Sequence, residues 1–159
     1  PYPLSYNGWG DVLVIVFFGF VPVGGTYYVQ ALTWTPDVTI ASLICGLLID
    51  TLLVVNNYRD READARSGKR TVIVRFGEKF GRYFYLMLGV TASLLCLCFL
   101  REGHFLAALL PQLYLIPHFL TWKRMVKIYS GKKLNSILGE TSRNMLFMGV
   151  LIAIGMLVS

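Results

Sequence analysis

Residues Asp50–Gly77 read DTLLVVNNYRDREADARSGKRTVIVRFG, and this stretch decides how the chain can fold. On a helix, at about 100° per residue, four polar residues fall within about 80° of one another: Asp50, Asn57, Asp60 and Asp64. Asn56 lies about 40° beyond them. Polar groups are expensive inside a bilayer and normally face a cavity. The sequence therefore predicts one helix with a polar stripe that runs from mid-membrane to an aqueous mouth.

The chain around this stretch is too apolar for an ordinary soluble domain. Of its 159 residues, 55% are hydrophobic and only 15% are charged, with a mean hydropathy of +0.59, whereas soluble domains are charged at about 25% of positions. A spanning helix needs roughly 20 mostly apolar residues. We therefore predict an all-α, polytopic transmembrane helix bundle that forms a single domain over residues 1–159. Its five spans lie near residues 12–32, 38–58, 83–100, 105–122 and 138–158.

The basic residues predict how the bundle is oriented. Eight Lys and Arg lie in residues 59–82 and six in residues 123–143. Because positive loops stay cytoplasmic, we expect a cytoplasmic N-terminus, outside turns at residues 33–37 and 101–104, and an outside C-terminus. The net charge of +6 then reflects topology rather than nucleic-acid binding. We expect a multi-pass protein of the cell (inner) membrane whose partner is the lipid bilayer.

Asp60 and Asp64 stand one helical turn apart, so their carboxylates can meet the same ligand. Two like charges at this spacing repel each other, and a divalent cation between them removes the repulsion. Mg²⁺ suits such a site, because it takes one or two carboxylates and completes its shell with water and phosphate oxygens. Neighbouring cations would suit a diphosphate: Arg59, Arg61, Arg66, Lys69, Arg70 and Arg75. The alternative is a solvated loop in which arginines pair with the acids, but that does not explain the polar residues inside the membrane.

The residues NNYRDREADARSGKRTVIVRFG, Asn56–Gly77, resemble the second aspartate-rich motif of the UbiA-type intramembrane prenyltransferases. The paired Asn and the Gly-Lys…Val-Arg tail are most similar to the branch that acts on 1,4-dihydroxy-2-naphthoate in menaquinone biosynthesis. The run Gly8–Gln30 is also similar to that branch. The family's first motif, an Asn-Asp-x-x-Asp on an earlier helix, is absent from these residues.

The resemblance implies a bundle of roughly nine helices around a central cavity, with this chain supplying the last five and an N-terminal part of the same enzyme supplying the rest. It implies that Asp60 and Asp64 bind Mg²⁺ and, through it, a polyprenyl diphosphate. Asn56 and Asn57 would support this site. The remaining implied substrate contacts come from Asp50, Arg59, Lys69 and Arg75, of which Arg75 is the candidate to hold the carboxylate that the naphthoate loses.

The chemistry implied is ionisation of an allylic diphosphate followed by attack of an electron-rich ring on the allyl cation. Metal and cationic side chains stabilise the charge that develops on the diphosphate. One alternative keeps this reaction and changes the acceptor to 4-hydroxybenzoate, haem, a chlorophyllide or a lipid glycerol. Another is a non-catalytic transporter or assembly subunit, which would need acids or bases on further helices to pair with the polar stripe.

Overall fold

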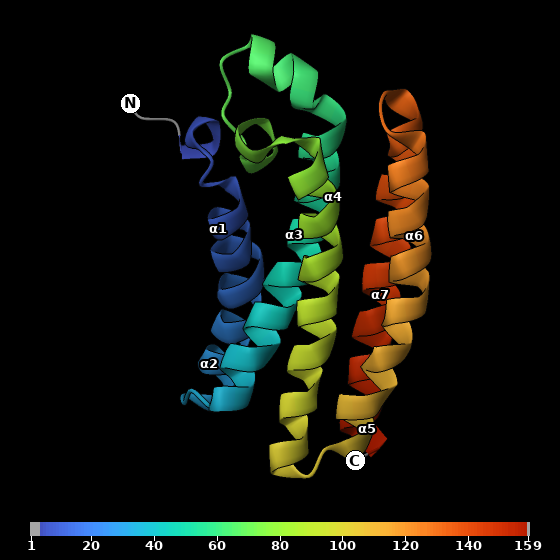
Figure 1. Cartoon of the computed structure of the whole chain (residues 1–159). Coiled ribbons are helices and arrows are strands. Elements are labelled where there is room, and N and C mark those ends of the chain that lie inside the picture. The colour runs from blue at the N-terminus through green and yellow to red at the C-terminus, as the bar shows by residue number, and fades with distance from the viewer. Residues whose placement is uncertain (1–3, 159) are drawn as a thin grey trace.

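The computed structural model describes residues 4–158, and no strand occurs among them. Five helical passes, each long and apolar enough to cross a membrane, run alongside one another (Figure 1). After a short turn, η1 (Leu4–Asn7), the passes are α1 (Gly10–Val14) with η2 (Ile15–Gly24) and α2 (Gly25–Ala31); α3 (Pro36–Arg66); α4 (Val72–Leu95) with η3 (Cys96–Glu102); α5 (Phe105–Leu109) with η4 (Leu110–Tyr114) and α6 (Leu115–Ile128); and η5 (Lys132–Leu134) with α7 (Asn135–Val158). The predicted all-α bundle is confirmed.

The two basic connections lie at one end of the bundle. Figure 1 shows the N-terminal end of the chain, the connection between α3 and α4, and the connection between α6 and α7 at the same end. The connections between α2 and α3 and between η3 and α5 lie at the opposite end, with the C-terminus. This is the alternation that the basic residues predict.

The helices agree with the predicted spans to within a few residues and extend beyond several of them, whereas the first pass ends at Ala31, one residue before the predicted end. The helix α3 continues for two turns past residue 58, so Asp60 and Asp64 are helical rather than part of a loop. The first pass begins at Gly10, which brings Asp11 into a helix. These two extensions add charged residues at the end of the bundle that carries the basic connections.

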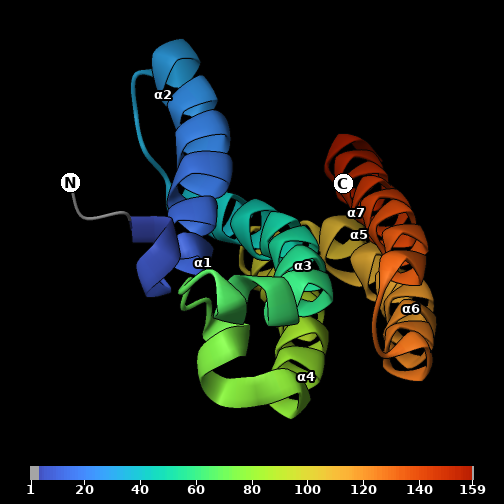
Figure 2. The same ribbon diagram turned by 90° about the horizontal axis from the view of Figure 1, so that it is seen from above.

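The long helix α3 lies at the centre of the fold. Figure 2 shows it between the first pass on one side and the pair α6–α7 on the other. Its start is fixed by the hydroxyl of Thr35, which accepts a hydrogen bond from the amide of Val38 at 3.3 Å, and by Pro36 in the first turn, where no amide donor is needed. Small residues let η2 approach closely, because a Cβ atom on Gly19 would meet the backbone of Gly46.

A buried aromatic and polar cluster joins α4, α6 and α7. The side chain of His118 is fully buried and stacks between the rings of Tyr85 and Tyr114. Its Nε2 lies 3.2 Å from the carbonyl oxygen of Leu86. Because a carbonyl only accepts, Nε2 donates and Nδ1 accepts from the Tyr114 hydroxyl at 2.9 Å. His118 therefore links α6 to α4 by an interhelical hydrogen bond.

Candidate active site

Asp60 and Asp64 lie on the last two turns of α3, where the helix leaves the packed part of the bundle. The helix ends at Arg66, and Gly68 takes a left-handed conformation, with φ of 77°, that reverses the chain. A residue without a Cβ atom adopts this conformation at little cost. The reversal brings the backbone amide of Lys69 within 2.9 Å of the carbonyl oxygen of Asp64. The turn thus folds the next residues back onto the acidic pair.

Both oxygens of Asp60 are held by the neighbouring guanidinium group. Arg59 donates from Nε to Oδ1 at 2.8 Å and from Nη2 to Oδ2 at 2.6 Å. The same guanidinium donates to the side-chain oxygen of Asn135, at the start of α7, at 2.8 Å. The Asp60 side chain remains 45% exposed. Asp60 is therefore accessible, and Arg59 connects it to the fifth pass.

Asp64 is the more enclosed acid of the pair, with its side chain 14% exposed. The ammonium group of Lys69 donates to its Oδ2 at 3.2 Å. Each carboxylate is thus paired with one cation, which is the pairing that the solvated-loop alternative expects. The helical setting differs from that alternative, since both acids stand on the helix that passes through the membrane.

The inner part of the predicted polar stripe faces the first pass. Asn57 is buried and lines a small pocket of about 60 Å³ together with Asp11, Lys69 and Thr71, among other residues. Two turns deeper, Asp50 is fully buried beside Asp11 of α1. Asp50 and Asn57 therefore lie between α3 and α1, away from the large hollow described next.

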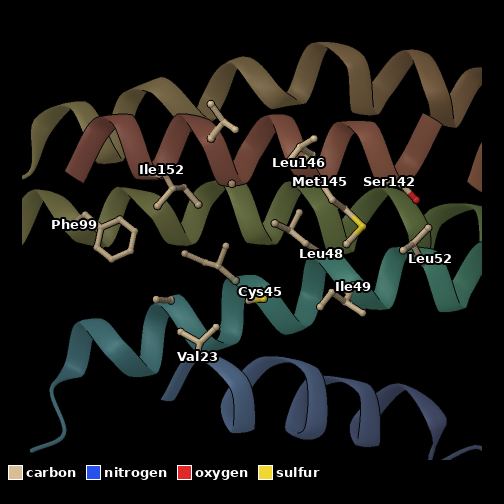
Figure 3. A pocket seen from close by; sticks show the side chains of 15 residues that line it. Val23, Cys45, Leu48, Ile49, Leu52, Phe99, Ser142, Met145, Leu146 and Ile152 are labelled. Carbon is tan, nitrogen blue, oxygen red and sulfur yellow. The ribbon is translucent and has the colours of Figure 1, made fainter. Parts of the chain in front are cut away.

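A large apolar hollow opens on the other face of α3. It measures about 690 Å³ and lies between α3, α7, η2 and η3. Leu52 and Ser142 stand towards one end of it and Phe99 towards the other (Figure 3). Asn56 follows Leu52 by four residues, so it shares the hollow's face of α3. The apolar wall thus leads up the helix towards Asn56 and the acidic pair.

Arg75 lies at the first turn of α4 and is exposed. Its guanidinium donates to the backbone carbonyl of Asn7 at 2.7 Å, and the amide of Arg70 donates to the carbonyl of Tyr6 at 2.8 Å. These bonds fasten the segment before α1 to the start of α4. In the part of the chain that the structure describes, Arg75 therefore lies on the α1 side of α3, with Asn57 and Lys69.

Sequence reasoning missed two residues of the site, Asp11 and Asn135. Asp11 stands directly before an uncharged run, and the helix had to begin two residues earlier than predicted to include it. The first pass therefore supplies an acid that meets the polar stripe, because Asp11 lies beside Asp50. Nothing in the sequence marks Asn135, since only the packing of α7 against α3 brings it to Arg59.

Comparison with known proteins identifies the family. The family model described as "UbiA prenyltransferase family" matches residues 1–147. The chain belongs to this family. A 1,4-dihydroxy-2-naphthoate octaprenyltransferase of Haemophilus influenzae is 34% identical over 98% of the chain and 51% of its own length. The enzyme of the same name in Escherichia coli is 42% identical over 60% of the chain and 30% of its own length.

A more distant UbiA relative covers the whole chain. The UbiA prenyltransferase domain-containing protein 1 of Dictyostelium discoideum is 30% identical over all of this chain and 47% of its own length. No solved structure gives a match. The UbiA chain described here spans about half the length of the two relatives that it matches from end to end. The resemblance found in Asn56–Gly77 is thereby confirmed at the level of the family.

Proposed function

We propose that the protein transfers a polyprenyl group from a polyprenyl diphosphate to 1,4-dihydroxy-2-naphthoate within the membrane, in an Mg²⁺-dependent step of menaquinone biosynthesis. The observation that carries this proposal is the continuity of two surfaces on α3. An apolar hollow of about 690 Å³ runs along one face, and the acidic pair Asp60 and Asp64 ends the same helix. A prenyl diphosphate has the matching parts, an isoprenoid tail and an anionic head.

The acidic pair suits a magnesium ion whose coordination shell is completed by oxygen atoms of the substrate and of water. Two carboxylates one turn apart are the donor set that Mg²⁺ takes when phosphate oxygens and water fill the other positions. No group of three or more His, Cys, Asp or Glu side chains suited to a metal occurs among residues 4–158, so these residues alone make no closed metal cage. When bound, the ion would neutralise charge on the diphosphate oxygens.

Arg59 and Lys69 would then stabilise the negative charge of the diphosphate leaving group. Their donors now satisfy Asp60 and Asp64, and both cations remain within reach if the carboxylates turn to a metal ion. As the C–O bond of the allylic diphosphate breaks, negative charge grows on the diphosphate, and fixed cations stabilise it. Asn56, on the face of α3 shared with the hollow, and Asn57 would support this end of the site by hydrogen bonds.

The hollow would hold the isoprenoid tail and exclude water from the allyl cation. Its lining is almost wholly apolar, with Phe99 and Met145 among the larger side chains and Cys45 among the smaller ones. Water that entered would quench the cation before the aromatic ring attacked. An acceptor carboxylate would need a cation near the ring, and Arg75 is our candidate for that role.

The choice of naphthoate acceptor rests on the relatives' names and on the motif Asn56–Gly77. To test it, the intact enzyme is reconstituted in lipid with Mg²⁺ and a polyprenyl diphosphate. It is then offered 1,4-dihydroxy-2-naphthoate or 4-hydroxybenzoate, and products are identified by mass. We expect a prenylated product that has lost carbon dioxide from the naphthoate alone. Transfer to 4-hydroxybenzoate, with none to the naphthoate, would reassign the acceptor within the same reaction class.

We further propose that the mouth of this site opens to the cytoplasm from the cell (inner) membrane. The support is the grouping of the basic connections at the end of the bundle that carries Asp60 and Asp64. Positive segments of this kind are retained on the cytoplasmic side. A diphosphate donor made in the cytoplasm would then reach the site from that side.

A further inference from the structure

Two carboxyl groups from different passes meet inside the bundle. Asp11 of α1 and Asp50 of α3 lie within hydrogen-bonding reach of each other, where α1 and α3 run side by side (Figure 1 and Figure 2). Asp50 is 0% exposed and Asp11 is 8% exposed. The two acids therefore form a buried pair that the proposed metal site does not use.

Asp50 is a buried carboxyl group without a hydrogen-bond partner among the residues that the structure describes. Neither of its carboxyl oxygens is bonded to a donor among the described residues, and no ion pair found within residues 4–158 includes Asp11 or Asp50. Two ionised carboxylates in contact, away from water, are strongly unfavourable. A proton between the two groups removes the repulsion and supplies the missing hydrogen bond.

A metal ion explains the pair less well than a proton does. The residues around Asp50 supply no third carboxylate, imidazole or thiolate ligand in the described part of the chain. The neighbouring hydroxyl of Thr51 donates to the carbonyl of Leu48 and is turned away from the pair. With only two ligands and little room for water around Asp50, a cation would be poorly coordinated. The proton is the ligand that this site fits.

A small polar pocket connects the pair to the proposed diphosphate site. Asp11, Asn57, Lys69 and Thr71 share this pocket of about 60 Å³, which has room for about two water molecules. The ammonium group of Lys69, on the connection between α3 and α4, also holds Asp64. From α4, the nearest cation is Arg75, which is bonded to the carbonyl of Asn7. A proton on Asp11 can thus exchange through the pocket with the region around Lys69.

We propose that Asp11 and Asp50 share one proton and that the pair accepts a second one, through the pocket, from a hydroxyl group of the aromatic acceptor. This rests on the proposed function. The hydroxyl O–H bond breaks and its electron pair moves towards the ring, whose carbon forms the new C–C bond to the allylic carbon. The diphosphate leaves with the electrons of the C–O bond. The attacked ring carbon then releases its carboxylate as carbon dioxide, and the electron pair of that bond restores the aromatic ring and returns negative charge to the oxygen. The pair gives the proton back to this oxygen.

A carboxyl pair that already holds one proton is suited to this exchange. The remaining carboxylate is a buried charge with no cation paired to it among the described residues. Taking up the second proton leaves the buried site neutral. Positioned proton transfer of this kind accelerates reactions by about 10²–10⁴-fold. The acids contact no substrate directly, so they act as a relay through the pocket.

The first test needs no substrate. Infrared spectra of the intact protein are recorded at neutral pH, and the spectrum of Asp50→Asn is subtracted. The amide of Asn donates to Asp11 as the shared proton does, so this variant should fold. We expect the difference to show the carbonyl band of a protonated carboxylic acid, shifted in D₂O. Asp11→Asn supplies the same comparison if Asp50→Asn does not accumulate. Loss of ionised carboxylate bands alone would overturn the shared proton.

The second test measures turnover. Asp50→Asn should lower kcat by about tenfold or more with KM for both substrates unchanged, and activity should recover at alkaline pH as the acceptor hydroxyl ionises unaided. Asp37→Asn, which changes a half-buried acid at the opposite end of α3, is the control and should resemble the unmodified enzyme. Equal pH profiles for the two variants would overturn the relay. The infrared measurement needs no substrate, so its result does not depend on whether the proposed transfer reaction is correct.

Discussion

The ammonium group of Lys69 lies 3.2 Å from the carboxylate of Asp64, because the chain reverses at Gly68 directly after α3 ends. This contact ties the acidic pair to the connection between α3 and α4. It also sets a cation beside the proposed diphosphate position. Replacement of Lys69 should therefore weaken stabilisation of the charge on the diphosphate while it leaves both proposed metal-binding carboxylates in place.

We expect Lys69→Gln to lower kcat/KM for the prenyl diphosphate by roughly 10–100-fold, since a charge-assisted hydrogen bond contributes about 1.5–3 kcal/mol. Its melting temperature should change little, because the ammonium group is partly exposed. Lys133→Gln removes the same charge from the exposed connection before α7 and serves as the control. Steady-state kinetics with both variants decide the matter. Equal values of kcat/KM would show that Lys69 does not act on the diphosphate.

The topology is tested by labelling single cysteines from outside the cell. Cys45, Cys96 and Cys98 are first replaced, and one cysteine is then introduced at Asp37, Gly103 or Ser67. The first two positions lie at the end of the bundle opposite the basic connections. We expect an impermeant reagent to label them and to spare position 67, because positive connections remain cytoplasmic. Labelling at position 67 alone would invert the orientation.

Packing between α4 and α6 depends on the absence of a side chain at Gly89. A Cβ atom there would clash with ring atoms of His118. We expect Gly89→Ala to destabilise the protein by about 1–3 kcal/mol, the usual range for overpacking. Gly139→Ala, also on a helix but with open space around the position, should be neutral or slightly stabilising. Thermal unfolding in detergent compares them, and equal melting temperatures would contradict the described packing.

The sequence predicts the helical bundle well because each pass is an almost uncharged run bounded by charges. It also predicts that Asp60 and Asp64 share a helix, since their spacing is local. The sequence does not predict which residues of different passes contact one another. The meeting of Asp11 with Asp50, and of Arg59 with Asn135, depends on how separate helices pack, and periodicity along one helix carries no information about its neighbour. The predicted stripe is likewise divided, with Asp50 and Asn57 towards α1 and Asn56 on the face of the hollow.

The central claim is that Asp60 and Asp64 act together on one metal-bound diphosphate. The most direct measurement is turnover by Asp60→Asn, Asp64→Asn and the double variant of the intact enzyme, with saturating Mg²⁺ and prenyl diphosphate. We predict that each single substitution lowers turnover by about 10²-fold or more, because leaving-group stabilisation is lost in the transition state. The double variant should lose little more, since both acids serve one ion. Near-normal turnover in either single variant, or losses that simply multiply, would contradict the account.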